Sequence, residues 1–269
     1  MNKKISFVGC GNMAEAIVSG IVKSGMNPLD IIASRRDAMK LNELHNKYGI
    51  TVTPSNKSAC ESADTVFLCV KPIMMKKICE EIKDSVLPHA TIVSIAAGVT
   101  IKQLQEWLGK DKKIIRAMPN TPAMVQEGMT SLSLSDMMKE DSQKEDVNNI
   151  KSLFECCGKC EIVEEYLIDA VIGVSGSAPA YIYMMIEAMA DGAVKEGMPR
   201  QMAYTFAAQA VLGSAKMVLE SGKHPGELKD MVASPAGTTI DAIAALEKNG
   251  FRNAVIQAVV TAAEKNKKM

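Results

Sequence analysis

The sequence predicts an α/β protein, in which a doubly wound parallel sheet is followed by an all-α C-terminal domain. Short apolar runs with strand character alternate with helical patterns in the first half of the chain. A glycine-rich turn follows the first of these runs, and strand signals fade after residue 163. We therefore expect two domains, residues 1–163 and 164–269, which a chain of 269 residues is long enough to form.

The first predicted strand, residues 5–8, runs into a glycine-rich turn and then into a helix predicted at residues 15–23. The turn has the pattern G-x-G-x-x-A. Its first glycine makes the tight turn, its second lets a pyrophosphate approach the backbone, and its last small residue allows close helix–strand packing. The position of this pattern between a strand and a helix indicates a Rossmann-type dinucleotide-binding domain. The turn consists of Gly9, Cys10, Gly11, Asn12, Met13 and Ala14.

The second predicted strand, residues 30–33, indicates which dinucleotide binds. An NAD-preferring fold usually ends this strand with an acidic residue for the ribose 2′-hydroxyl. This chain has Ser34, Arg35 and Arg36 there. Arginine binds phosphate bidentately and keeps its charge, so the segment favours NADP(H). A solvated arginine pair is the competing interpretation, Asp37 weakens the argument, and NAD(H) stays an alternative cofactor.

Three further apolar strands, residues 65–70, 91–95 and 113–118, each end in small residues or prolines. Helical patterns lie between them, for example at residues 75–83 and 101–108. Ligands bind parallel sheets at the carboxyl ends of the strands, so backbone at these ends is expected to lie close to a flat cofactor.

The second half of the chain, after a short strand at residues 160–163, is predicted to be helical. The segment 181–194 is apolar almost all round, which requires burial on most sides. A helical region of this length has little room to surround such a helix by itself. We therefore expect a homodimer with interleaved helices.

A turn near the C-terminus, residues 234–239, gathers small and hydroxyl residues before a helix predicted at residues 240–248. Backbone N–H groups, hydroxyls and the helix dipole converge there, so a small anion such as a carboxylate fits. The competing interpretation is that Thr238 or Thr239 only caps the helix.

The composition points to no nucleic acid or membrane partner, because 31 basic and 31 acidic residues give a net charge of zero. No uninterrupted apolar run is expected to span a bilayer, and the N-terminus is too short for a secretory signal. Seven cysteines, an odd number, suggest reduced thiols and a cytoplasmic location. Cys156, Cys157 and Cys160 lack a second ligand group at zinc spacing, so we expect no metal.

These segments together resemble, from end to end, the pyrroline-5-carboxylate reductases, which make proline in the last step of its biosynthesis. The β-hydroxyacid dehydrogenases have a similar Gly/Ser-rich turn but place a catalytic lysine on the helix after it. No lysine occurs here between Lys159 and Lys195. The motifs that carry the resemblance are the turn at Gly9, Ser34, Val70-Lys71-Pro72, residues 96–100, Asn120-Thr121-Pro122, residues 176–181 and residues 228–240.

The resemblance implies NADPH-dependent reduction of the cyclic imine 1-pyrroline-5-carboxylate to L-proline by hydride transfer. It implies that residues 9–14 hold the pyrophosphate, that Ser34 with Arg35 or Arg36 holds the 2′-phosphate, and that Asn56 lies beside the adenosine. It also implies a lining for the nicotinamide half, made of Val70, Lys71, Pro72, Ala96 and Ala97.

For the substrate, the resemblance implies that Ser234, Thr238 and Thr239 receive the carboxylate, and that Thr239 hydrogen-bonds the imine nitrogen as the catalytic residue. It places Glu165 near the substrate ring from the partner subunit, in a homodimer that many members assemble into decamers. Some members of the family carry asparagine where this chain has Met231, and glycine is common where it has Ala178 and Ala236.

Two alternatives stay open. One is a reductase of another cyclic imine or small keto acid on the same scaffold, and the other is a non-catalytic NADP-binding sensor. An iminium is already electrophilic, so its reduction needs positioning rather than a metal or a covalent nucleophile.

Overall fold

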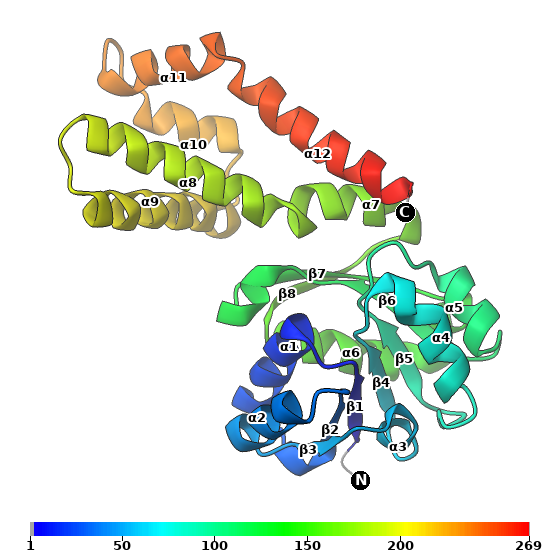
Figure 1. The fold of residues 1–269 in the computed structure, drawn as a ribbon. Helices are drawn as coiled ribbons and strands as arrows, with labels where there is room; N and C mark the ends of the chain where they lie inside the picture. Colours follow the sequence, from blue (N-terminus) through cyan, green and yellow to red (C-terminus); the bar gives the residue numbers. More distant parts are fainter. Residues whose placement is uncertain (1–2, 269) are drawn as a thin grey trace. The chain divides into compact units, whose positions relative to one another are not determined.

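The computed structural model describes residues 3–268 and divides into two compact units (Figure 1). The first contains the described residues of Met1–Gly176 and Ala262–Met269, and the second is Ser177–Thr261. The predicted domain boundary, after residue 163, stays a prediction. The compact first unit extends past it to Gly176. The reason is that residues 164–176 attach to the first unit: Ile168 and Ile172 are buried, and Asp169 accepts a 2.6 Å hydrogen bond from Asn266.

The described part of the first unit contains one eight-stranded sheet, ordered β3-β2-β1-β4-β5-β6-β7-β8. All neighbouring strands are parallel except β6 and β7, which are antiparallel. The predicted doubly wound parallel sheet is confirmed. The antiparallel pair involves β7, a strand that the sequence did not predict. The strands are β1 Ile5–Val8, β2 Ile31–Ser34, β3 Thr51–Thr53, β4 Thr65–Leu68, β5 Thr91–Ser94, β6 Lys113–Met118, β7 Gly128–Leu134 and β8 Gly158–Ile162.

Helices cover both faces of this sheet (Figure 1). Phe7 on β1 stacks on Phe67 of the neighbouring strand β4 at 4.6 Å between ring centroids, and Phe154 of α6 meets Phe67 edge-on at 5.7 Å. This aromatic row anchors α6 to the centre of the sheet. One face carries α1 Asn12–Lys23, α2 Ala38–Tyr48 and α6 Lys144–Glu155, and the other carries α3 Asn56–Cys60, α4 Pro72–Ile82 and α5 Ile101–Leu108.

The segment after β8 is helical, as expected, but it is built from three short turns of different types. It begins with a 3-10 turn at Glu165–Leu167, continues as α7 Ile168–Val171, and ends in a π-helical turn at Ile172–Gly176. π-helical turns are rare and often occur at functional sites. This one directly precedes the second unit.

The second unit is helical. Helices α8 and α9 pack closely because small side chains lie between them, and Ala190, Ala203 and Ala207 are the buried residues of this pair. Many large apolar side chains stay exposed within the chain, among them Met184, Phe206 and Leu219. The helices are α8 Ala178–Lys195, α9 Arg200–Ser221, α10 Pro225–Val232, α11 Thr238–Lys248 and α12 Phe251–Lys267, whose end belongs to the first unit.

One helical stretch in the described residues, Glu165–Lys195, is long and apolar enough to cross a membrane by length and composition alone. The stretch contains Asp169, Glu187 and Asp191, so it is not an uninterrupted apolar run of the kind considered in the sequence. Little of its most apolar window is buried within the chain.

Candidate active site

The glycine-rich loop lies at the point where the strand order of the sheet reverses, between β1 and β4. Gly9 has a φ of +81°, and a Cβ at this position would lie 2.3 Å from Cγ1 of Val70. The amides of Gly9 and Cys10 both donate to the carbonyl of Ser34 at 3.0 Å. Only glycine fits the first position, and the loop is tied to the carboxyl end of β2.

The N-terminus of α1 is open to an anion. The helix begins at Asn12 after Gly11, and no side chain caps it. A Cβ on Gly11 would meet nothing closer than the Gly9 carbonyl oxygen at 4.0 Å, so the backbone here is accessible. Unpaired N–H groups and the helix dipole together favour a phosphate, which fits the pyrophosphate predicted at residues 9–14.

Two buried residues of the glycine-rich loop are also compatible with a bound phosphate. Ala14 is buried, so α1 lies close to the sheet. Burial, with a smaller contribution from Glu15, raises the pKa of the Cys10 thiol to about 12. The thiol is therefore neutral near pH 7 and opposes no bound phosphate.

A cavity of about 250 Å³ adjoins the loop and collects several of the predicted cofactor residues. Arg35 donates from Nη1 to the Cys10 carbonyl at 3.0 Å, and Arg36 is exposed. Two guanidinium groups at one cavity suit a bound phosphate group. The lining is Gly9, Arg35, Arg36, Asp37, Asn56, Val70, Met74 and Ile78, of which Asp37, Met74 and Ile78 had no predicted site role.

Ser34 is buried and does not line this cavity. Its hydroxyl donates to Oδ1 of Asn56 at 2.8 Å, and Nδ2 of Asn56 donates to Glu81 at 3.2 Å. The structure thus shows Ser34 orienting Asn56 at the cavity wall. A direct contact from Ser34 to a 2′-phosphate stays a prediction.

The remaining predicted cofactor residues follow two neighbouring strands, β4 and β5, which pair in register from Thr65 and Thr91 onwards. Lys71 precedes α4, which begins at Pro72, and both residues are exposed. Ala96 is buried and Ala97 is half-buried after β5. The sheet therefore brings these segments to the same edge as the glycine-rich loop.

Glu165, predicted to bind substrate, makes two contacts within the first unit. Its Oε1 accepts hydrogen bonds from the Ile101 amide at 2.8 Å and from Nη1 of Arg116 at 3.1 Å. Arg116 lies on β6 and is only 6% exposed. Sequence reasoning gave Arg116 no role, although a lone charge within an apolar strand pattern was an available signal.

Asn120 has a structural role that sequence reasoning also missed. Its Nδ2 donates to the Ser175 carbonyl at 3.3 Å and to the Ser175 hydroxyl at 3.2 Å, while its Oδ1 accepts from the Met129 amide at 2.9 Å. Asn120 therefore links the start of β7 to the π-helical turn.

The turn at residues 234–239 lies in the second unit, between α10 and α11. The helix begins at Thr238, its N-cap is Gly237, and no side chain caps it. The interpretation of Thr238 or Thr239 as a cap is therefore wrong, because both residues are already in the first helical turn. No hydrogen bond of the Ser234, Thr238 or Thr239 hydroxyl occurs within residues 3–268.

The uncapped helix and free hydroxyls are the features that a bound carboxylate requires. Gly237 donates to the Ser234 carbonyl at 3.0 Å, and a Cβ on Gly237 would lie 2.4 Å from the Ser234 Oγ. Ala236 has a φ of +54°, a conformation that favours glycine. Met231 is exposed on α10.

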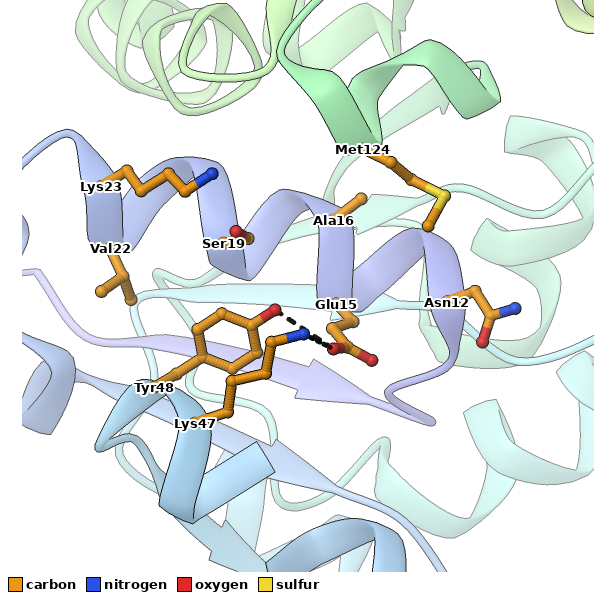
Figure 2. A pocket seen from close by; sticks show the side chains of 9 residues that line it. All are labelled: Asn12, Glu15, Ala16, Ser19, Val22, Lys23, Lys47, Tyr48 and Met124. Carbon is orange, nitrogen blue, oxygen red and sulfur yellow. Dashed lines mark hydrogen bonds and ion pairs between the residues drawn. The ribbon is translucent and has the colours of Figure 1, made fainter. Parts of the chain in front are cut away.

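A larger cavity of about 670 Å³ beside α1 does not coincide with the predicted site (Figure 2). Of the predicted residues, only Asn12 lines it. Lys47 and the Tyr48 hydroxyl donate to Glu15 Oε1 at 2.9 and 3.1 Å. The hydrogen bond from Lys47 lowers the pKa of Glu15, although partial burial acts in the opposite direction. The negative charge of this carboxylate is therefore already balanced by Lys47.

The cysteines make no cluster with other ligands. Cys157 and Cys160 are buried, and Cys156 donates to the Ser152 carbonyl at 3.2 Å. Within residues 3–268, no group of three or more His, Cys, Asp or Glu side chains is placed to hold a metal ion.

The doubly wound sheet, the glycine-rich loop at its switch point and the arginine-lined cavity define a dinucleotide-binding enzyme with a helical second domain. Comparisons with known proteins agree. A family model described as "NADP oxidoreductase coenzyme F420-dependent" matches residues 4–98, and one described as "Pyrroline-5-carboxylate reductase dimerisation" matches residues 165–269.

A protein named pyrroline-5-carboxylate reductase from Escherichia coli K12 is 51% identical over 270 residues, covering 100% of this chain and 99% of the relative. A solved pyrroline-5-carboxylate reductase from Coxiella burnetii has a TM-score of 0.92 and 36% identity, covering 100% of this chain and 98% of the other. A Plasmodium falciparum pyrroline carboxylate reductase, solved with NADP bound, has a TM-score of 0.88 and 29% identity. The match covers 99% of this chain and 98% of the other. The chain belongs to the pyrroline-5-carboxylate reductase family of oxidoreductases.

Proposed function

We propose that this chain reduces 1-pyrroline-5-carboxylate to L-proline with NADPH. The observation that carries the proposal is the 51% identity, from end to end, with the Escherichia coli protein of that name. The geometry supports it with two separate anion-accepting features, the arginine-lined cavity and the uncapped turn at residues 234–239.

The first unit is proposed to hold the cofactor. The open N-terminus of α1 would bind the pyrophosphate, and Arg35 with Arg36 would bind the 2′-phosphate. Residues 70–72 with Ala96 and Ala97 would line the nicotinamide half. When bound, NADPH supplies the hydride for the C=N carbon. The NADP-bound relative supports this choice, and use of NAD(H) remains an alternative.

The second unit is proposed to hold the substrate. Ser234, Thr238 and the free amides of α11 would bind its carboxylate, while Thr239 would donate its hydroxyl to the imine nitrogen. Because a protonated imine is already electrophilic, fixing its position supplies much of the acceleration. An unperturbed hydroxyl is a poor acid, so Thr239 acts first by orienting the ring and only second as a proton relay.

The second unit is also the part of the chain through which we expect two subunits to associate. We infer that its exposed apolar side chains pack against a second copy of the chain in a homodimer, which the family's dimerisation region at residues 165–269 supports. We also propose that five such dimers assemble into a decamer and that the protein is located in the cytoplasm. A monomeric hydrodynamic size at micromolar concentration would contradict the homodimer.

Substrate profiling tests the proposed reaction against its alternatives. Pyrroline-5-carboxylate, other cyclic imines and small keto acids are assayed with NADPH, and the first is expected to give the highest kcat/KM. A higher kcat/KM for another imine or keto acid would show that this other compound is the preferred substrate. If NADP binds but no compound is reduced, the result would favour the NADP-binding sensor. That hypothesis predicts that proline does not change the unfolding temperature in the presence of NADP.

A further inference from the structure

Glu165 joins three segments of the first unit that are far apart in the sequence. It stands in the 3-10 turn after β8, and its Oε1 meets the first amide of α5 and the guanidinium of Arg116 on β6. A single carboxylate oxygen that accepts two hydrogen bonds, one from a buried arginine, is a fixed element of structure.

The contact with α5 completes the start of that helix. Thr100 and Gln103 form a reciprocal capping box, which satisfies the amides of both residues. The amide of Ile101 is not part of that box, and Glu165 accepts it at 2.8 Å. A carboxylate at a helix N-terminus is also favoured by the helix dipole.

The contact with Arg116 reaches the other end of the same loop. Arg116 pairs in register with Ser94, the last residue of β5. Residues 95–100 connect Ser94 to α5, and they include Ala96 and Ala97. Glu165 therefore fixes this loop at its exit through Ile101 and braces its entrance through Arg116.

We propose that Glu165 is a positioning residue that holds the 95–100 loop in place for the nicotinamide half of the cofactor, acting through Arg116 and Ile101. The identity of the cofactor rests on the proposed function. Glu165 then controls NADPH binding from within its own subunit, whereas the family resemblance placed it beside the substrate ring.

The test measures the NADPH dissociation constant by fluorescence titration, together with kcat and KM for pyrroline-5-carboxylate. Glu165→Ala removes both hydrogen bonds, while Glu165→Gln keeps an acceptor for the Ile101 amide and loses the charge opposite Arg116. Glu164→Gln is the matched control, because this neighbouring carboxylate is exposed and pairs with the exposed Lys139.

We expect the NADPH dissociation constant to rise about tenfold in Glu165→Ala and by a smaller factor in Glu165→Gln, with the control unchanged. The KM for pyrroline-5-carboxylate at saturating NADPH should stay within about twofold of the parent. Combining Arg116→Met with Glu165→Ala should weaken NADPH binding by less than the product of the single effects.

An unchanged NADPH dissociation constant in Glu165→Ala, with or without a raised KM for the imine, would overturn the proposal. If Glu165→Ala does not fold, the same comparison is made with Glu165→Gln, where unchanged NADPH binding also overturns it. Because NADPH binding is measured without substrate, a parent that binds NADPH but reduces no pyrroline-5-carboxylate would contradict the proposed function alone.

Discussion

Arg35 and Arg36 are adjacent in the sequence but make different contacts at the same cavity. Arg35 donates to the Cys10 carbonyl and so supports the glycine-rich loop, whereas Arg36 is exposed and makes no hydrogen bond within residues 3–268. Arg35 therefore has a structural role besides the binding role proposed for it, whereas the guanidinium of Arg36 is available for the proposed 2′-phosphate contact.

We predict that Arg36→Ala weakens NADPH binding about tenfold and leaves NADH binding nearly unchanged, because only NADPH carries the 2′-phosphate. Arg35→Ala should weaken the binding of both cofactors, because it also releases the loop. Fluorescence titration with each cofactor measures this, with Lys40→Ala, an exposed lysine paired with Glu43, as the control. Equal losses for both cofactors in Arg36→Ala would count against the assignment.

Thr239 is the residue that we propose to hydrogen-bond the imine nitrogen. We predict that Thr239→Val, which keeps the shape and removes the hydroxyl, lowers kcat for pyrroline-5-carboxylate by at least about tenfold and leaves NADPH affinity nearly intact. Steady-state kinetics and NADPH titration check the two parts. Thr51→Val, at an exposed position of the edge strand β3, is the control, and full activity of Thr239→Val would refute the role.

The turn between α10 and α11 is the element where the local sequence suggested a helix cap and the structure shows an open helix start. Because Gly237 takes the N-cap position, the hydroxyls of Thr238 and Thr239 are left for a ligand. The turn includes Ala236 in the left-handed region, which an alanine occupies at a cost of about 1 kcal/mol.

We predict that Ala236→Gly stabilises the chain by about 0.5 kcal/mol, because relief of this strain exceeds the extra entropy of the unfolded glycine chain. Ala233→Gly is the matched control in the same turn. Ala233 has a φ of −102°, so the substitution there should destabilise. Opposite shifts of the unfolding temperature at equal protein concentration are expected, and a loss of stability in both variants would show that the strain is absent.

Strand β7 shows why some elements could not be predicted from the sequence. Its residues Gly128–Leu134 alternate leucine with serine and threonine, and Thr130, Ser131 and Ser133 are buried. Buried hydroxyls can bond across the chain, as Ser133 does to the Val163 carbonyl at 2.9 Å. The strand forms because β6 and β8 lie beside it, which is long-range information that a local pattern lacks.

The strands with mostly apolar runs were predictable for the opposite reason. Ile5–Val8 and Lys113–Met118 have the bounds expected, and so does the helix Ile101–Leu108. The gathering of the strand ends at one edge of the sheet was also predictable, because neighbouring parallel strands end on the same side. The contacts between Glu165 and Arg116 could not be predicted, because they depend on how the segment after the last strand folds back onto the sheet.

At the scale of the whole molecule, ion pairs tie the start of the chain to distant segments of the first unit. Asp146 on α6 accepts from Lys3 at 2.9 Å and from Lys113 at 2.8 Å. Burial alone would raise the pKa of Asp146, but these hydrogen bonds and charges outweigh it and lower the pKa below 3.8. The pKa of Asp64 is lowered likewise, since the Lys4 amide and His89 outweigh burial.

We predict that the free energy of unfolding falls as the pH drops below the ordinary value of 3.8. A carboxylate with a depressed pKa in the folded state contributes stability above its unfolded pKa and loses it as the pH falls through its folded pKa. Urea unfolding between about pH 6 and pH 3 measures this. Asp146→Asn should flatten the decline, and the exposed Asp141→Asn should not; identical slopes in all three proteins would contradict the account.

A steady-state assay of pyrroline-5-carboxylate reduction with each nicotinamide cofactor shows whether this chain makes proline with NADPH. We predict oxidation of NADPH coupled to stoichiometric formation of proline, with a higher kcat/KM for NADPH than for NADH. Binding of NADPH with no conversion of pyrroline-5-carboxylate to proline with either cofactor would contradict this function.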